Sequence, residues 1–472
     1  MQDKRILQTE EYFLQQIKSA VTEHHWSDDT SKLKVSFKNI DFQFHKLVEV
    51  NETGLELYFS NCSLSGKRID ITINELSEKL NNIEFSECEI NCDFLLKDSK
   101  LEYLIINKTD ITSDNFHVSS NEIHSFSLVG KPEKPNSISS LILHENKIIK
   151  STDCRLNQFQ FLYINHCDFI EGFTLNANTI ERLQIEKSDF RKDFEFWKNN
   201  LGDFSLIEKS SLGEVKAKQS NFGKEIKFRD VDFLERTDFT ELKSDQTNLK
   251  FENCTFQKNT YFDSSRVLNL DFKSVVFQGI TSFQLLNCLH FIRFETSYFE
   301  KIGFFEGMTI GNLNSIDVNT IRTIKGQLSK SESKIEYLKY NAIEQRKHFQ
   351  KLTLKDSDFY ILLLNKWSND FGRNWGKGVR FTMKISFFFF LLLILTNTFV
   401  SSTYPISLNF NHSYAGFSTI LSEYLKFTFS LGFSSEEFQS NGYLYIIFVM
   451  AKIFIGYGIY QTITAFRKFG KV

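Results

Sequence analysis

The chain has 472 residues, with 56 lysines and arginines against 58 aspartates and glutamates, so its formal net charge is −2. This balance excludes the strong basic field that attracts nucleic-acid phosphates, and no nucleic-acid partner is expected. Phenylalanine is frequent, at 51 residues, and proline is rare, at 3. Such a composition favours long regular strands over disordered linkers.

Residues 1–32 are predicted to form a helical cap. The segment begins MQDKRILQTEEYFLQQIKSAV, which is polar and lacks the apolar core of a secretory signal peptide. The seven cysteines show neither CxxC pairs nor the Cys/His spacing of zinc sites. Without an export signal we expect them to be reduced thiols, and no metal or other cofactor is expected.

A repeat with a period of 21 to 23 residues occupies residues 33–312. Each unit has alternating apolar residues, a polar pair, a small or polar residue and a final apolar residue, as in FLYINHCDF (161–169) and LKFENCTF (249–256). The evenly spaced final residues are Ile148, Phe169, Phe190, Leu212, Phe233, Phe256, Phe277 and Phe299. A short unit with period-two alternation predicts one coil of a β-solenoid, in which the final residues form an internal ladder.

Four cysteines share one position in this repeat. Cys62, Cys88, Cys167 and Cys254 each lie two residues before the ladder residue. A small apolar side chain at a recurring position indicates an inward-facing corner, so we favour core packing over metal or redox chemistry for all four.

The repeat resembles that of the pentapeptide-repeat proteins. The stretches HCDF (166–169), KSDF (187–190), QSNF (219–222) and DVDF (230–233) match that family's small residue, Asp or Asn, and Leu or Phe most closely. The resemblance implies a right-handed quadrilateral β-helix. The segment GKPEKPN (130–136) interrupts the pattern and is expected to be an inserted loop.

Residues 313–380 are predicted to be a helical connector with an interfacial segment. Apolar residues recur from Ile321 to Ala342 at spacings of 3, 4 and 7, which predicts one amphipathic helix of about 35 residues. It either caps the end of the solenoid or forms a stalk or helical hairpin at a subunit interface. Residues 359–381 then combine apolar side chains with two tryptophans and several cations, a composition typical of the membrane interface.

Residues 381–472 contain two candidate membrane spans, ISFFFFLLLILTNTFV (385–400) and YLYIIFVMAKIFIGYGIYQTITAF (443–466). Basic residues precede the first span and follow the second, whereas the connection between them has one basic residue, Lys426. The positive-inside rule therefore predicts a multi-pass protein of the cell (inner) membrane, with both termini and the solenoid in the cytoplasm.

The connection between the spans contains YAGFSTILSEYLKFTFSL (414–431), whose apolar residues follow helical spacing. The segment is too short and too polar to cross a bilayer, so we expect a re-entrant half-helix. Irregular backbone at membrane depth is tolerated where it lines a water-filled pathway or is buried in protein. The C-terminal dipole of such a half-helix favours a cation at the membrane centre.

Residues 378–468 resemble the two-transmembrane pore module of the potassium-channel superfamily. The resemblance lies in the order of the segments, which is a span, a pore helix, a filter-like loop and a second span. That family's filter phrase, Thr-Val-Gly-Tyr-Gly, falls on the successive positions Ser430, Leu431, Gly432, Phe433 and Ser434. The resemblance implies four subunits and a permeant monovalent cation, potassium in that family. Because serines stand in place of the first Thr and the second Gly, we expect a cation pathway without strict potassium selectivity.

Further residues take roles from the same resemblance. Thr428 belongs to the last turn of the pore helix, and Gly456 and Gly458 lie at the distance of the inner-helix hinge glycine. Glu436 and Glu437 are either an acidic ring at the outer mouth or two solvated acids on an external loop.

Lys452 falls near the middle of the second span, where a charge is costly unless it faces water or a partner. Facing the pore, it would oppose cation flow or act as a gate. Facing Glu423, it would form an intramembrane pair, the arrangement that we slightly favour.

These features predict a homotetrameric cation channel gated by a cytoplasmic solenoid that senses an unknown ligand or protein. Two alternatives are a membrane-anchored interaction scaffold and a stress or immunity effector that depolarises the membrane. Rossmann, P-loop and HExxH motifs are absent from the sequence, and an enzyme is not expected.

Overall fold

The computed structural model describes residues 5–25, 33–74, 81–113, 115–133, 135–313, 315–400, 414–429 and 442–466. These residues form two compact units. The first is a β-solenoid unit that ends at Thr320, and the second is a helical unit that starts at Ile321. Each unit has its own core and is described separately below.

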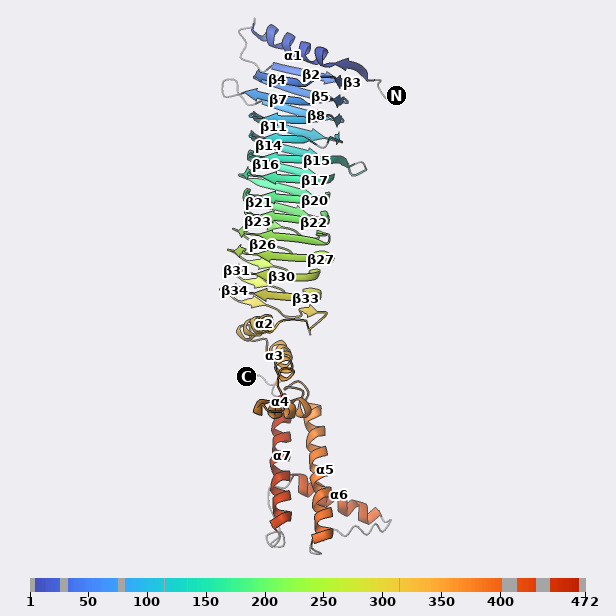
Figure 1. The fold of residues 1–472 in the computed structure, drawn as a ribbon, viewed down its shortest axis with the longest axis vertical. Helices are drawn as coiled ribbons and strands as arrows, with labels where there is room; N and C mark the ends of the chain where they lie inside the picture. The colour runs from blue at the N-terminus through green and yellow to red at the C-terminus, as the bar shows by residue number, and fades with distance from the viewer. Residues whose placement is uncertain are drawn as a thin grey trace. The chain divides into compact units, whose positions relative to one another are not determined.

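The solenoid has about 12 turns, whose strands stack into two long parallel sheets (Figure 1). The strands of the first sheet are β1 (Ile6–Thr9), β3 (Ile40–Phe44), β4 (Val48–Thr53), β6 (Ser63–Gly66), β7 (Ile69–Asn74), β9 (Glu89–Asn91), β10 (Phe94–Lys97), β12 (Asp110–Ile111), β13 (Phe116–Ser119), β15 (Asn136–His144), β17 (Asn157–Asn165), β20 (Thr179–Glu186), β22 (Asn200–Glu208), β24 (Glu225–Arg229), β27 (Lys243–Glu252), β30 (Arg266–Lys273), β33 (Asn287–Glu295) and β36 (Thr309–Ile310).

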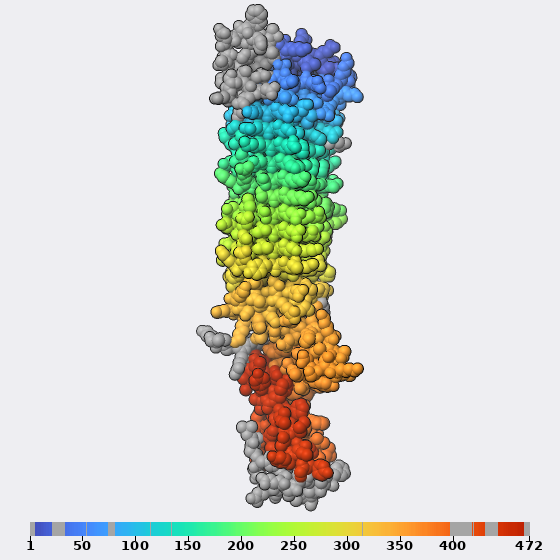
Figure 2. All heavy atoms as spheres, turned by 60° about the vertical axis from the view of Figure 1, so that its left-hand side comes forward, coloured from blue at the N-terminus to red at the C-terminus, as the bar shows by residue number. Residues whose placement is uncertain are grey.

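The strands of the second sheet are β2 (Leu33–Lys38), β5 (Leu55–Ser60), β8 (Asn81–Ser86), β11 (Lys100–Asn107), β14 (Glu122–Val129), β16 (Lys147–Arg155), β18 (Asp168–Phe169), β19 (Gly172–Asn176), β21 (Asp189–Trp197), β23 (Ser211–Lys216), β25 (Asp232–Phe233), β26 (Thr237–Asp238), β28 (Thr255–Phe256), β29 (Thr260–Tyr261), β31 (Val276–Phe277), β32 (Thr281–Ser282), β34 (Tyr298–Phe299) and β35 (Gly303–Phe304). Figure 2 shows the successive coils as layers. Each strand pairs with its counterpart in the next coil, as β27 does with β30 and β30 with β33.

The predicted apolar ladder is confirmed. Each of its eight residues is the register partner of the next, from Ile148 opposite Phe169 to Phe277 opposite Phe299. All eight are at most 4 % exposed. The ring centroids of Phe233 and Phe256 lie 4.3 Å apart, and those of Phe277 and Phe299 lie 4.6 Å apart. The period of the sequence is therefore the length of one coil.

A second phenylalanine column lies on the opposite sheet and packs against the first. Its members Phe228, Phe251, Phe272 and Phe294 are register partners in successive coils, and their rings stack at 4.9 to 5.1 Å. Rings of the two columns meet edge to face, as Phe251 and Phe256 do at 5.5 Å. Phenylalanine rings therefore fill the space between the two sheets, which accounts for the high phenylalanine content.

The coil corners explain the cysteines. Each of Cys62, Cys88, Cys167 and Cys254 follows a residue with a φ between 49° and 57°, where the chain turns from one sheet toward the other. All seven cysteines are unpaired and buried. Burial raises the pKa of Cys254 and of Cys288 to about 12, so neither thiol is poised for redox or metal chemistry. The expectation of a small inward residue at a shared corner is confirmed.

Buried asparagines form a polar ladder at a corner of several other coils. Asn157 donates through Nδ2 to Asn178 Oδ1 (3.0 Å), and Asn178 donates in turn to Asn199 Oδ1 (3.2 Å). Asn178 also accepts from the Asn157 backbone N–H (2.9 Å) and donates to the Cys154 carbonyl (2.9 Å). One side chain therefore satisfies two backbone groups of the preceding coil and ties its own coil to that coil.

Replacing Asn178 by alanine is expected to lower the free energy of unfolding by at least about 2 kcal/mol. The change leaves the Asn157 N–H and the Cys154 carbonyl buried without this partner. Urea unfolding followed by circular dichroism measures the effect. Thr179→Ala, one residue along on the exposed face, is the control and is expected to change stability little. An equal effect of the two substitutions would contradict a structural role for the ladder.

Within residues 1–32, the described part contains β1 and α1 (Glu10–His25). Phe13 and Ile17 of α1 are buried, and the Phe13 ring lies 5.1 Å from that of Phe37 and 5.4 Å from that of Phe42. An amphipathic helix thus covers the apolar interior that the first coil would otherwise expose.

The connector is two helices, α2 (Val318–Lys330) and α3 (Lys334–Phe349), so the prediction of one continuous helix was wrong. The break falls at Ser-Glu-Ser 331–333, where Glu332 has a φ of 56° that a right-handed helix cannot accommodate. The helices fold back on each other, and Glu344 of α3 accepts from Arg322 of α2 (2.8 Å) and from Lys325.

The helical unit continues with α4 (Ser357–Ser368), α5 (Trp375–Val400), α6 (Tyr414–Phe429) and α7 (Gly442–Phe466). The segment Trp375–Thr396 and the whole of α7 are long and apolar enough to cross a membrane. Figure 1 shows α5 and α7 side by side and α4 lying across one end of the pair. The two predicted spans are therefore packed helices of one unit.

Candidate membrane pore module

Small residues bring the two long helices together. A Cβ atom added to Gly458 of α7 would collide with the Thr382 hydroxyl of α5, and one added to Gly378 would collide with Thr462. Such close approach is the usual role of glycine between helices in a membrane. Gly456, by contrast, faces open space. Of the two glycines expected at a hinge, Gly458 thus lies in the helix contact, whereas Gly456 has room for local movement.

Helix α6 ends against the middle of α5. The Thr428 hydroxyl donates to the Tyr424 carbonyl (2.7 Å), so the Ser386 hydroxyl is left to donate to Thr428 across 2.6 Å. Both hydroxyl-bearing residues are buried, and Ser386 lies close to the midpoint of α5. The Tyr424 hydroxyl donates to the Met383 carbonyl (2.9 Å). Polar contacts therefore hold the last turns of α6 at mid-height on the first span.

An apolar cluster joins the three helices at the same level. Its buried members are Phe390, Leu393, Ile394, Phe427, Ala451 and Ile455. Phe427 is the contribution of α6, and its ring lies 5.6 Å from that of Phe390 on α5 and 6.0 Å from that of Phe448 on α7. Figure 1 shows α6 rising obliquely toward the middle of the α5–α7 pair. Both α5 and α7 therefore pack around the C-terminal end of the shorter helix α6.

Lys452 lies beside that end. Its ammonium donates to the carbonyl oxygen of Phe427 and lies 5.2 Å and 4.9 Å from the ring centroids of Phe427 and Phe448. Glu423, the expected partner of Lys452, instead forms an ion pair with Lys426 at 2.9 Å. The lysine charge therefore lies at the negative end of the α6 dipole, where the sequence argument expected a permeant cation.

The expected filter lies outside the described residues. This applies to Ser430, Leu431, Gly432, Phe433 and Ser434, and equally to Glu436 and Glu437. Of the residues named for the pore, the structure therefore places Thr428, Lys452, Gly456 and Gly458. It brings Thr428 and Lys452 to the same end of α6.

A buried polar network at the other end of the spans was not predicted from the sequence. The Tyr457 hydroxyl and the Gln461 amide of α7 donate to Asn365 Oδ1 of α4, at 2.8 Å and 3.1 Å. Asn369 donates to the Gln461 side-chain oxygen and is 2 % exposed. The sequence feature that could have indicated this network is Gln461, because a side-chain amide within an apolar helix needs a hydrogen-bond partner from the protein. The network fastens α4 to the end of the second span.

No family model, no curated protein and no solved structure matches this chain in comparisons with known proteins. The described residues thus provide a β-solenoid, which is consistent with the pentapeptide-repeat resemblance, and two helices that could span a membrane. The potassium-channel resemblance depends on the order of the segments and on the sequence of the connecting loop.

Proposed function

We propose that this chain assembles into a symmetric ring, of four subunits by the channel resemblance, that conducts monovalent cations across the cell membrane. The observation that carries the proposal is the position of the α6 C-terminus at mid-height on both candidate spans, against Ser386 and Lys452. A helix end at that depth presents carbonyl oxygens where lipid offers no donors. Such an end is tolerated beside water or protein, and a closed ring around a wet axis supplies both.

A single protomer has two spans and cannot enclose a conduit, so conduction requires several copies. Exposed apolar side chains are available for contacts with lipid or with other copies. On α5 they include Phe387, Phe388 and Leu391, and on α7 Ile446 and Ile453. The cytoplasmic placement of the solenoid rests on the basic residues that flank the spans. In this arrangement the solenoid is the sensor, and α2, α3 and α4 connect it to the pore.

Cation flux from vesicles that contain the purified full-length chain tests the proposal. Gly432→Val is expected to reduce flux to the level of empty vesicles, because the channel resemblance assigns Gly432 to the filter and a β-branched residue resists the backbone shapes needed there. Gly442→Val is the matched control, since a Cβ atom added at this position meets nothing within 4 Å. Absence of flux from the wild-type oligomer would favour the scaffold instead, and unchanged flux in Gly432→Val would contradict the filter assignment.

A further inference from the structure

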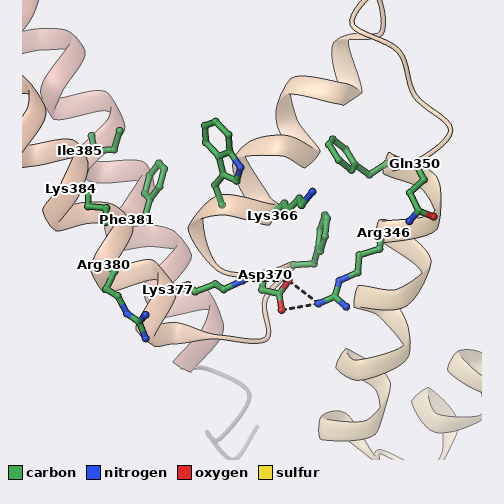
Figure 3. Close-up of a pocket in the computed structure, with 12 residues that line it drawn as sticks. Arg346, Gln350, Lys366, Asp370, Lys377, Arg380, Phe381, Lys384 and Ile385 are labelled. Carbon is green, nitrogen blue, oxygen red and sulfur yellow. Dashed lines mark hydrogen bonds and ion pairs between the residues drawn. The ribbon is translucent and has the colours of Figure 1, made fainter. Parts of the chain in front are cut away.

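A cavity of about 800 Å³ lies in the helical unit, between α3, the end of α4 and the first turns of α5 (Figure 3). Five cationic side chains line it, and they come from all three helices. They are Arg346, Lys366, Lys377, Arg380 and Lys384. Asp370 is the single acidic residue of the lining. The cavity therefore carries a net positive charge. The sequence did not reveal this cluster, because its five cationic residues come from three helices and are up to 38 positions apart.

The Asp370 carboxylate does not neutralise all of these cations, because it is already paired with Arg346 and lies near Lys377. Asp370 accepts from Arg346 through both oxygens, each at 2.8 Å, and Lys377 lies 3.9 Å from one of them. Figure 3 shows Arg346 and Lys377 approaching Asp370 from opposite sides. Within the described part of the chain, Lys366, Arg380 and Lys384 have no carboxylate at ion-pair distance. Three charges in one cavity are therefore left for an external anion.

Aromatic and aliphatic groups form the rest of the lining. Phe349 holds the Lys366 ammonium 5.0 Å from its ring centroid, and Phe381 and Ile385 extend the wall along α5 toward its apolar part. Trp367 also lines the cavity and is 62 % exposed. Tyr360 and Ile361, on the same short helix α4, are 55 % and 58 % exposed. An apolar surface that ends in tryptophan beside a span is typical of a helix at the lipid–water boundary.

We infer that this cavity binds the phosphate headgroup of an anionic phospholipid. Lys377, Arg380 and Lys384 stand at i, i+3 and i+7 in the first turns of α5 and line the cavity. Basic residues at this position, where a span enters the bilayer, are those that attract a headgroup phosphate. The apolar wall formed by Phe381 and Ile385 lies along the direction of the acyl chains. A free phosphate would satisfy the same cations but would leave this wall uncovered. The inference rests on the membrane position of α5 and does not require that the protein conducts ions.

Quenching of Trp367 by brominated lipid tests the inference in the full-length chain reconstituted in phosphatidylcholine vesicles. Trp26, Trp197 and Trp375 are first replaced by phenylalanine, so that Trp367 is the single tryptophan. Brominated phosphatidylglycerol at low mole fraction is expected to quench more strongly than brominated phosphatidylcholine, with a preference of at least about tenfold. Each basic residue near an anionic lipid contributes roughly a fivefold gain in association. Trp367→Phe removes the reporter and is expected to remove the lipid-specific difference.

Two triple variants separate the cavity from general surface charge. Lys366→Gln, Arg380→Gln and Lys384→Gln together are expected to bring the preference close to one, while the Arg346–Asp370 pair preserves the fold. Lys330→Gln, Lys351→Gln and Lys355→Gln remove the same charge from exposed positions and are expected to retain the preference. Circular dichroism checks that both variants are folded.

Three results would overturn the inference. The first is equal quenching of the wild-type chain by the two lipids, and the second is equal loss of the preference in both triple variants. The third is complete displacement of the anionic lipid by excess inorganic phosphate, which would identify a site for the free anion. Because lipid binding is read without ion flux, its failure is distinguishable from failure of the channel proposal.

Discussion

Replacing Lys452 by methionine is expected to raise monovalent cation flux through the reconstituted protein by about tenfold or more. The Lys452 ammonium binds the Phe427 carbonyl at the end of α6, so a fixed positive charge lies where the half-helix dipole would stabilise a permeant cation. Methionine keeps an unbranched side chain of similar length between the Phe427 and Phe448 rings but removes the charge. Flux from vesicles at equal protein content measures the change.

Lys426→Met is the matched control for this prediction. Lys426 belongs to α6 as well, but its side chain is 67 % exposed and pairs with Glu423. Loss of this surface charge is expected to change flux by less than about twofold. Size-exclusion chromatography checks that the oligomer is retained in both variants. Flux that stays the same or falls in Lys452→Met, with the oligomer intact, would show that the lysine charge does not oppose cations.

Replacing Phe251 by alanine is expected to lower the free energy of unfolding of the solenoid by about 3–5 kcal/mol. Phe251 stacks between Phe228 and Phe272 and also meets rings of the opposite column, including Phe256 at 5.5 Å. The strand of Phe251 is paired with a neighbouring coil on each side, so the sheets cannot move into the space that the ring leaves and a cavity remains. Loss of contact to both neighbouring coils also weakens the coupling between them.

Denaturant unfolding of the full-length chain, followed by the β-sheet circular dichroism signal, measures this loss. Tyr298→Ala is the control, because Tyr298 belongs to the same solenoid and is 62 % exposed. It is expected to cost less than about 1 kcal/mol. A similar loss for both variants would mean that the phenylalanine columns do not dominate the stability of the solenoid.

The solenoid was predictable because every coil repeats the same physical requirement. An inward residue at one corner must stack on its counterpart one coil later, so Phe256 and Phe277 appear at the coil period in sequence and as register partners in space. The corner cysteines were predictable for the same reason. The spacing of residues along the sequence therefore predicted which strands pair and in which register. This is rare outside repeat architectures.

The helical unit was less predictable because its decisive contacts join residues that share no period. Asn365 and Gln461 are 96 positions apart, and neither is distinctive until the two are seen to bond. The sequence showed that the charge of Lys452 is costly within an apolar helix. It could not show the hydrogen-bond acceptor of that lysine, because the acceptor is the backbone carbonyl of Phe427 and no sequence pattern marks a backbone group. The break at Glu332 interrupts an apolar spacing that continues across it, so periodicity alone predicted one helix.

Electron cryo-microscopy of the full-length chain in lipid nanodiscs tests the central claim most directly. We expect a closed ring of copies around a solvent-accessible axis, with the C-terminal ends of α6 directed at that axis halfway across the bilayer. Isolated protomers, or a ring whose centre is filled by packed side chains or lipid and whose α6 helices lie flat at the membrane surface, would contradict it.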